Sequence, residues 1–175
     1  ANRALAFNSS LDYSILEIDN LEHFKGKKIV VAKNLIKEIT ESCGLKNFKE
    51  LKTFKGSAFK KTICYHPFVK MKFDHDVPMF DAQFVNLDQG TGIVHCAPRH
   101  GPDDFNLCLK NNIPSKYTVD NAGLYTEEIP FFHNTHIFKA DSIVIEKLKE
   151  YNQLLKNDKL NHSYPHSWRS KAPLI

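Results

Sequence analysis

Glycine, proline and polar residues gather around one short apolar run between Gly90 and Phe105. The segment reads GTGIVHCAPRHGPDDF, so glycines precede the apolar Ile93 and Val94 and prolines follow them. Glycine and proline are the strongest local breakers of regular structure, so a strand here must be short and must lead into sharp turns. Polar side chains beside such turns are typical of a functional site carried on loops.

The residues around this run predict a strand, a turn, a second strand and then a helix. Gln83–Asp88 alternates before the Gly90-Thr91-Gly92 turn, and Gly92–Cys96 continues as an apolar strand, so we expect a hairpin. Pro102 suits the first position of a helix, because the first helical N–H has no partner within the helix.

His95 and Asp104 are the candidate functional residues, since the strand ends with the first and the helix opens with the second. Unpaired N–H groups and the positive dipole end of a helix favour an ionised carboxylate, so we expect Asp104 to be an anion. The same effect makes acidic residues common in first helical turns without a further role, which is the plain interpretation of Asp103. A histidine at a strand end is likewise more often structural than catalytic.

Taken together, the glycines, His95 and the aspartate pair resemble the editing domain of isoleucyl-tRNA synthetase, the insertion that interrupts the synthetic domain. Two other stretches agree. Gly56–Phe68 ends in Tyr65-His66-Pro67-Phe68, and His162–Lys171 resembles the return of the chain to the synthetic domain. Valyl and leucyl relatives usually lack a histidine at the position of His95, so the resemblance points to the isoleucyl branch.

The chain departs from the family pattern in two places. A threonine-rich strand that lines the family's editing pocket precedes the residues that Ala1-Asn2-Arg3-Ala4 resemble, so we interpret residues 1–175 as a single editing domain, excised from a larger synthetase without that strand. Ser167 stands where the family often has cysteine, beside the retained Trp168-Arg169.

The resemblance implies hydrolytic proofreading of valyl-tRNA(Ile), with valyl-adenylate as a possible additional substrate. A pocket for isoleucine cannot strongly exclude valine, because one methylene is worth about 1 to 3 kcal/mol, a figure known from isoleucyl-tRNA synthetases themselves rather than derived from this chain. A second, smaller pocket therefore admits valine and hydrolyses the ester. No cofactor is expected in this domain, since ATP and Mg²⁺ belong to the parent synthetase.

Roles for individual residues follow from the same resemblance. Asp104 is expected to bind the α-ammonium group, and His95 to line the pocket against the amino-acid side chain, with a general base as its alternative role. Further substrate contacts are expected from Gly90, Thr91, Gly92, His100 and Asp103. The expected partners are the tRNA(Ile) 3′ end carrying valine and the synthetic domain of the parent chain.

Lysines cluster between residues 46 and 61, although the net charge is only +4. Lys46, Lys49 and Lys52 are the candidates for contact with RNA phosphates. Phe48, Phe54 and Phe59 interleave with them, but phenylalanines at such spacing more often point into the core than stack on bases. A solvated lysine-rich face is the competing interpretation.

Composition favours one globular domain, because 42% of the 175 residues are hydrophobic. No secretory signal or long apolar run occurs, so we expect a soluble, cytoplasmic chain without membrane contact, and a monomer. The four cysteines show no paired C-x-x-C spacing and are expected to be free thiols: Cys43, Cys64, Cys96 and Cys108.

The overall pattern predicts a mixed α/β fold that is rich in sheet. Strands are expected over residues 13–18, 28–32, 51–54, 61–65, 83–87 and 92–96. Helices are expected over residues 35–44, from Pro102, and after Asp141 as N-cap through Leu155. The family resemblance implies more, namely a closed six-stranded β-barrel with peripheral helices.

Two other functions remain open. A metal-dependent hydrolase could use His95, His100, Asp103 and Asp104, but Pro98 and Pro102 break the helical spacing of paired histidine ligands. Asp74-His75-Asp76 is a second possible cation site, or simply an exposed turn. The other alternative is a module that binds the aminoacylated tRNA end without turnover.

Overall fold

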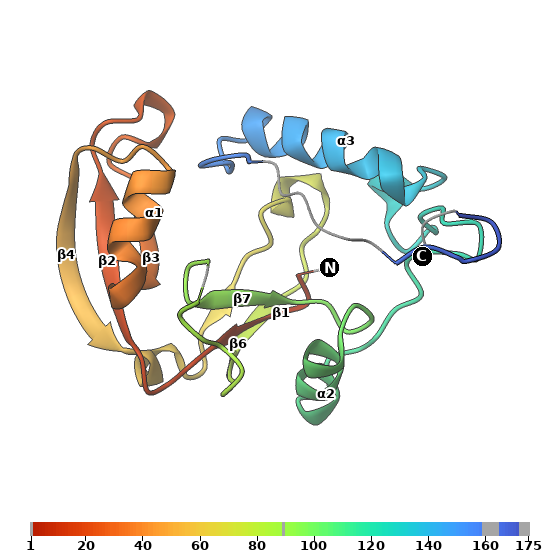
Figure 1. Cartoon of the computed structure of the whole chain (residues 1–175), viewed down its shortest axis with the longest axis horizontal. Helices are drawn as coiled ribbons and strands as arrows, with labels where there is room; N and C mark the ends of the chain where they lie inside the picture. Colours follow the sequence, from red (N-terminus) through yellow and green to blue (C-terminus); the bar gives the residue numbers. More distant parts are fainter. Residues whose placement is uncertain (1, 89, 159–164, 172–175) are drawn as a thin grey trace. The chain divides into compact units, whose positions relative to one another are not determined.

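The structure is a computed structural model that describes residues 2–88, 90–158 and 165–171. Contacts within the chain divide it into two compact units, Ala1–Ser115 and Lys116–Ile175. The first unit contains every strand of the two sheets described below, together with helices α1 and α2 (Figure 1).

A four-stranded sheet forms the centre of the first unit, in the order β5-β6-β1-β7 (Ile63–Cys64, Val77–Asp81, Ala4–Phe7, Ile93–Cys96). β1 runs parallel to β6 and antiparallel to β7. Its small residues Ala4 and Ala6 are fully buried in one cluster with Leu107 and Cys108 of helix α2 (Pro102–Lys110). These small side chains let the helix approach the sheet closely, so α2 has a fixed place beside β1 and β7.

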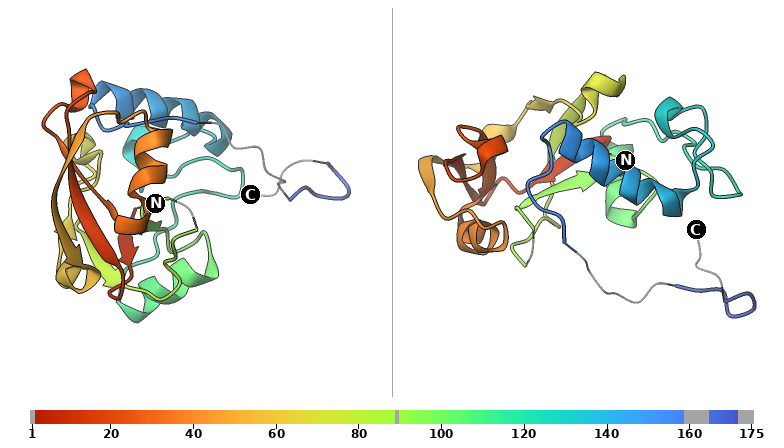
Figure 2. Two further views of the ribbon diagram at one scale, coloured as in Figure 1. Left: turned by 60° about the vertical axis from the view of Figure 1, so that its left-hand side comes forward. Right: turned by 90° about the horizontal axis from the view of Figure 1, so that it is seen from above.

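The second sheet of this unit has three strands in the order β3-β2-β4, which are Lys28–Ala32, Asp12–Ile18 and Phe48–Lys55. Tyr13 of β2 is fully buried, and its ring centroid lies 6.4 Å from that of Phe54 and 5.0 Å from that of Phe59. Phe54 and Phe59 are partly buried and pack against this core, as their spacing predicted, whereas Phe48 is exposed. Helix α1 (Ile36–Ser42) lies beside this sheet (Figures 1 and 2) and ends before Gly44, whose positive φ of 66° allows the chain to turn.

The mixed α/β class predicted from the sequence is confirmed, but the closed six-stranded barrel is wrong. Two separate sheets are present in the described residues, and neither closes. The two sheets approach where the Ala32 N–H, at the end of β3, donates to the Thr91 carbonyl at 2.7 Å. Gly92 and Ala32 are in such close contact there that the loop packs on the end of β3, and no strand ladder between β3 and β7 is formed.

The predicted hairpin is also wrong, because β7 pairs with β1 and residues 83–87 form no strand. Ala82 donates its N–H to the Phe7 carbonyl, Val85 donates to the Ala82 carbonyl, and the Asn8 amide donates to the Val85 carbonyl. These bonds fold the segment into a turn against the end of β1, which buries Val85. The apolar residues in this segment are therefore buried by a turn and not by a strand.

The other predicted strands differ from the observed ones mainly in length. The predicted strand over residues 28–32 is confirmed as β3, and the strand predicted over 13–18 begins one residue earlier as β2. β4 extends the predicted 51–54, whereas only Ile63–Cys64 of the predicted 61–65 pairs, with β6. Five short 3₁₀ helices complete the described fold: Glu22–Phe24, Lys33–Leu35, Gly56–Phe59, Val69–Met71 and Pro130–Phe132.

The second unit contains helix α3, Ile137–Glu150. It begins earlier than predicted because His136, not Asp141, is the N-cap, and its ring accepts the Phe138 N–H at 3.3 Å. Phe132 is buried against Tyr125 and Phe131. No helix in the described ranges has the length and apolar character needed to span a membrane. Residues 162–164 of the predicted return segment lie outside the described residues.

Candidate functional site

The end of β7, the start of α2 and the short connection between them carry four of the predicted site residues: His95, His100, Asp103 and Asp104. His95 lies on β7 opposite Leu5 of β1. The chain then turns, and the His100 N–H donates to the Ala97 carbonyl at 3.0 Å. Gly101 is the N-cap of α2 and Pro102 its first residue, as the sequence predicted. His95 near the end of β7 and Asp104 in the first turn of α2 therefore flank one short connection, which contains His100.

The two aspartates at the start of α2 differ in their surroundings. Asp104 is partly buried, and its Oδ1 accepts the Ala97 N–H at 2.8 Å. Its other oxygen, Oδ2, lies over Gly101, where an added Cβ would be only 3.1 Å away. Asp103 is exposed. The structure thus holds Asp104 in one orientation and leaves its Oδ2 beside a residue that has no side chain.

His95 is exposed, and its Nδ1 lies 3.0 Å from Oδ1 of Asn2. Asn2 has a φ of 51°, in the left-handed region that asparagine tolerates better than most residues. Its backbone carbonyl lies 3.3 Å from Nε2 of His75. Asn2 therefore connects the candidate site to a histidine from another part of the chain.

Charges at the site affect its neighbouring titratable groups. Partial desolvation lowers the pKa of His100, while the Asp104 carboxylate acts in the opposite direction. Burial, with a further contribution from Asp104, raises the pKa of the Cys96 thiol to about 12 and also raises that of Cys108. Both thiols are protonated near neutral pH, so neither is a ready nucleophile.

The Gly90-Thr91-Gly92 loop is fixed by contacts of its own. The Tyr13 hydroxyl donates to the Gly92 carbonyl at 2.7 Å, and an added Cβ on Gly92 would lie 2.5 Å from Cβ of Ala32. The Thr91 hydroxyl donates to the Ile93 carbonyl at 3.1 Å. In contrast, Gly90 has open space around its α-carbon. Close packing of the loop on β3 thus accounts for Gly92, and only Gly90 leaves room for a ligand.

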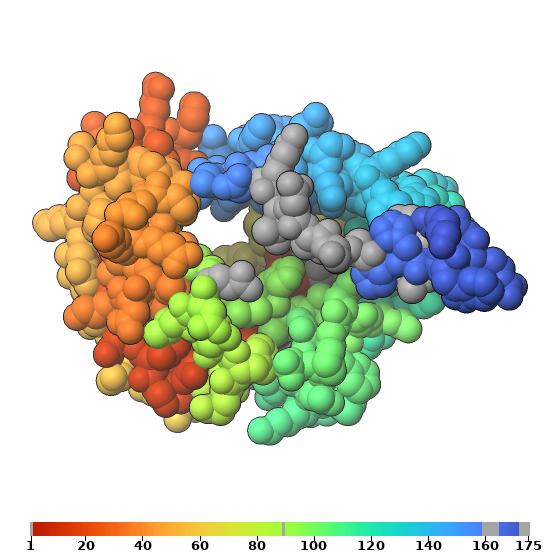
Figure 3. Space-filling view, in the orientation of Figure 1, coloured from red at the N-terminus to blue at the C-terminus, as the bar shows by residue number. Residues whose placement is uncertain are grey.

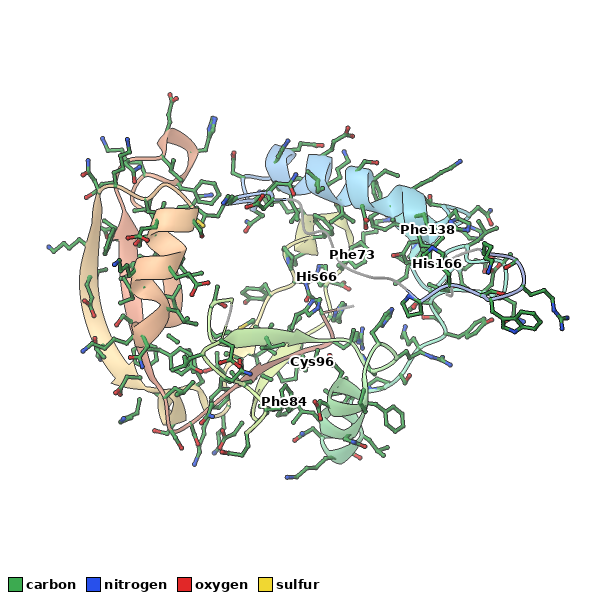
Figure 4. The ribbon with its side chains drawn as sticks, in the orientation of Figure 1. His66, Phe73, Phe84, Cys96, Phe138 and His166 are labelled. Atoms are coloured by element: carbon green, nitrogen blue, oxygen red, sulfur yellow. The ribbon has the colours of Figure 1, made fainter. Side chains whose placement is uncertain are left out.

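An aromatic cluster with two histidines lies near Asn2 in the first unit. The buried His66 ring stacks on Phe73, with centroids 5.0 Å apart, and lies 5.3 Å from the ring of His75 (Figure 4). His66 Nδ1 accepts the Phe68 N–H at 3.0 Å. Burial, and then the positive charge that His75 carries when protonated, lowers the pKa of His66 to about 4, so the ring is neutral at physiological pH.

The three candidate RNA-binding lysines are exposed on or next to edge strand β4, which lies at the surface in Figure 3. A bulge near Leu51 makes Lys52 oppose Ile15 while Lys49 opposes Glu17. Ile15 and Glu17 lie on the same face of β2, so the bulge brings Lys49 and Lys52 to one face. Lys46 precedes the strand.

Among the described residues, no group of three or more histidine, cysteine, aspartate or glutamate side chains could hold a metal ion. Asp74 and Asp76 are exposed and His75 between them is partly buried against Asn2. An open depression in the second unit, lined by Lys116, Tyr117 and residues 126–128, contains none of the predicted site residues.

Asn2 and His66 were not predicted from the sequence as neighbours of the site, and His75 was interpreted only as part of a cation site or an exposed turn. Asn2 is 93 positions from His95 and 73 from His75, so no local spacing joins them. The one available signal was the unusual number of histidines, nine in all.

Comparison with known proteins places the chain in a family. A family model described as "Leucyl-tRNA synthetase, editing domain" matches residues 20–162. The whole chain is 59% identical to the isoleucine–tRNA ligase of Pelagibacter ubique (strain HTCC1062) and 37% identical to that of Actinobacillus pleuropneumoniae serotype 7 (strain AP76), of which it covers 19% and 18%. The chain thus spans about a fifth of the length of these relatives.

A solved structure described as "The crystal structure of GlLeuRS-CP1" has a similar fold, with a TM-score of 0.64 at 14% identity over 91% of this chain and 79% of that one. At this identity the likeness concerns the fold alone. The family match and the identity to isoleucine–tRNA ligases, in contrast, extend over most or all of the sequence. The chain belongs to the editing-domain family of the aminoacyl-tRNA synthetases, and its sequence relatives are isoleucine–tRNA ligases.

Proposed function

We propose that this editing domain hydrolyses the ester of mischarged valyl-tRNA(Ile). The observation that supports the proposal most directly is the arrangement of the β7–α2 connection. It presents an exposed histidine, His95, together with an aspartate, Asp104, whose orientation the Ala97 N–H fixes. A cationic amino group and a neutral ester are the two features of an aminoacyl-tRNA end that such a pair can recognise.

Asp104 binds the α-ammonium group of the substrate in this proposal. One oxygen is engaged by the Ala97 N–H, and a carboxylate keeps further lone pairs for a second donor. Oδ2 lies over Gly101, where a side chain would come within 3.1 Å of it, so glycine at this position keeps a Cβ away from that oxygen. A hydrogen bond between two charged groups is stronger than one between neutral groups, so this contact both binds and orients the substrate.

Hydrolysis then needs a water molecule at the carbonyl carbon. The water oxygen bonds to that carbon, the bond from the carbon to the ribose oxygen breaks, and the ribose oxygen takes a proton. Valine and tRNA with a free terminal hydroxyl are the products. Cys96 and Cys108 are protonated thiols, so water rather than a cysteine is the nucleophile. The step as proposed uses no resident cofactor.

Selectivity arises at His95, whose ring forms the wall that valine clears and isoleucine meets. A difference of one methylene is worth about 1 to 3 kcal/mol, the value known from this class of enzyme. Lys46, Lys49 and Lys52 are proposed to contact the tRNA backbone, and the synthetic domain of the parent chain delivers the mischarged end.

The test is the deacylation of pre-formed valyl-tRNA(Ile) and isoleucyl-tRNA(Ile) by the full-length synthetase, with this chain assayed in parallel. We expect valine to be released much faster than isoleucine, and a zinc chelator that spares Mg²⁺ to change neither rate. Binding of valyl-tRNA(Ile) without release would instead support a non-catalytic module. Loss of activity on chelation would support a metal-dependent hydrolase.

A further inference from the structure

Asn2 joins two histidines that are distant in sequence. Its Oδ1 lies 3.0 Å from Nδ1 of His95, and its backbone carbonyl lies 3.3 Å from Nε2 of His75. We propose that Asn2 is a positioning residue that sets the tautomer and ring orientation of His95, and that His75 holds Asn2 in place. The effect of this tautomer on deacylation rests on the proposed editing function, whereas the assignment of the tautomer does not.

The tautomer of His95 follows from the chemistry of its partner. The amide oxygen of asparagine can only accept a hydrogen bond, so His95 Nδ1 must carry the proton in the 3.0 Å contact. A neutral imidazole has one N–H, which leaves Nε2 with its lone pair. His95 therefore offers an acceptor, not a donor, on the side of the ring that faces away from Asn2.

Asn2 is itself held on both sides. The next residue, Arg3, donates its N–H to the Cys96 carbonyl at 3.0 Å, directly beside His95. The Asn2 carbonyl can only accept, so His75 donates through Nε2–H. Burial lowers the pKa of His75, and its ring lies 5.3 Å from that of buried His66. A neutral His75, supported by an aromatic cluster, thus fixes the peptide whose side chain meets His95.

The experiment measures the tautomer directly by ¹⁵N NMR of the histidine-labelled chain above the pKa of the ring, with the His95 signal identified by its loss in His95→Gln. We expect a protonated Nδ1 and an unprotonated Nε2 in the wild type. Asn2→Asp retains an acceptor and should keep this tautomer. Asn2→Ala removes it and should release the ring into a mixture of tautomers, while His75→Phe should give a smaller change in the same direction.

His136, in the second unit, is the internal control, because a variant that merely unfolds changes its signal as well. A wild-type His95 that is protonated on Nε2 overturns the proposal, as does an unchanged tautomer in folded Asn2→Ala. In the full-length enzyme, Asn2→Ala should slow valyl-tRNA(Ile) deacylation about 3- to 10-fold, the effect of one net hydrogen bond. If the wild-type enzyme deacylates neither ester, the proposed function fails, but the NMR result still decides the tautomer.

Discussion

One carboxylate oxygen of Asp104 accepts the Ala97 N–H, and the other is proposed to bind the substrate ammonium group, which one substitution can test. Asparagine at position 104 retains an oxygen that accepts the Ala97 N–H but loses the negative charge. Loss of a hydrogen bond to a charged group costs about 1.5 to 3 kcal/mol, so Asp104→Asn should slow valyl-tRNA(Ile) deacylation about tenfold to over a hundredfold.

The matched control is Asp103→Asn, which makes the same chemical change at the exposed neighbouring position. It should slow deacylation by less than about fivefold, since a dipole contribution at a helix start is below about 1 kcal/mol. Equal losses in the two variants, measured at subsaturating substrate, would show that the ammonium group is not bound by Asp104.

In the proposed mechanism, selectivity between valine and isoleucine depends on His95. If its ring is the wall that isoleucine meets, His95→Ala opens space for the additional methylene, and the variant should begin to deacylate isoleucyl-tRNA(Ile). The difference in activation free energy between the two deacylations should fall by about 1 to 3 kcal/mol, the one-methylene difference known from this enzyme class. A general base would lower both rates in parallel and leave the ratio unchanged, so the two rates measured side by side decide.

At the scale of elements, the Gly90-Thr91-Gly92 loop offers a matched pair of substitutions. Both glycines have positive φ, at 78° and 75°, so alanine at either position costs about 1 to 3 kcal/mol of backbone strain. Only Gly92→Ala also forces a Cβ to 2.5 Å from that of Ala32. We expect the free energy of unfolding, from denaturant titration, to fall further in Gly92→Ala than in Gly90→Ala. Equal losses would mean that the loop does not pack on β3.

The lysines on and next to β4 allow a second test at this scale. Replacing Lys46, Lys49 and Lys52 by glutamine should weaken tRNA binding and reduce the slope of log affinity against log salt by about 0.7 for each lost phosphate contact. The matched control replaces three exposed lysines on helices, Lys110, Lys139 and Lys149. An unchanged slope with increased self-association, measured by sedimentation, would instead mean that the lysines protect an open sheet edge.

How much of this fold the sequence predicted depends on how local each element is. β7 and α2 were found because glycines and prolines mark their ends within a few residues. β1 and β6 were missed because each is short and is defined by pairing between residues 4–7 and 77–81, which no local period records. The alternation of polar and apolar residues over 83–87 was interpreted as a strand, yet this segment forms a turn in which Val85 is buried.

The candidate site shows the same division. His95 lies near the end of β7 and Asp104 in the first turn of α2, so the order of strand, turn and helix was enough to place both beside the same connection. Asn2 and His75 reach the site through contacts between distant parts of the chain, which only the folded sheet establishes. The barrel was inferred from the family resemblance and not from individual residues. In the structure the two sheets remain separate, and Gly92 packs on Ala32 without strand pairing between β3 and β7.

At the scale of the whole molecule, His66 makes stability depend on pH in a defined window. Its pKa is about 4 in the folded chain, mainly because of burial, against about 6.5 in an unfolded chain. Between these values the unfolded state binds a proton that the folded state does not, so acidification favours unfolding. The stabilisation is complete above pH 6.5 and is lost progressively down to pH 4, by up to about 3 kcal/mol.

His66→Asn isolates this contribution. An asparagine oxygen can replace Nδ1 as acceptor of the Phe68 N–H but does not titrate in this range. The variant loses the stacking on Phe73 and is expected to be less stable at pH 7.5, yet its denaturation midpoint should change less between pH 7.5 and 4.5 than that of the wild type. The pKa of His75 is also lowered by burial, which leaves a residual slope in the variant. Parallel pH dependences for the two proteins, followed by circular dichroism, would show that the acid sensitivity comes from groups other than His66.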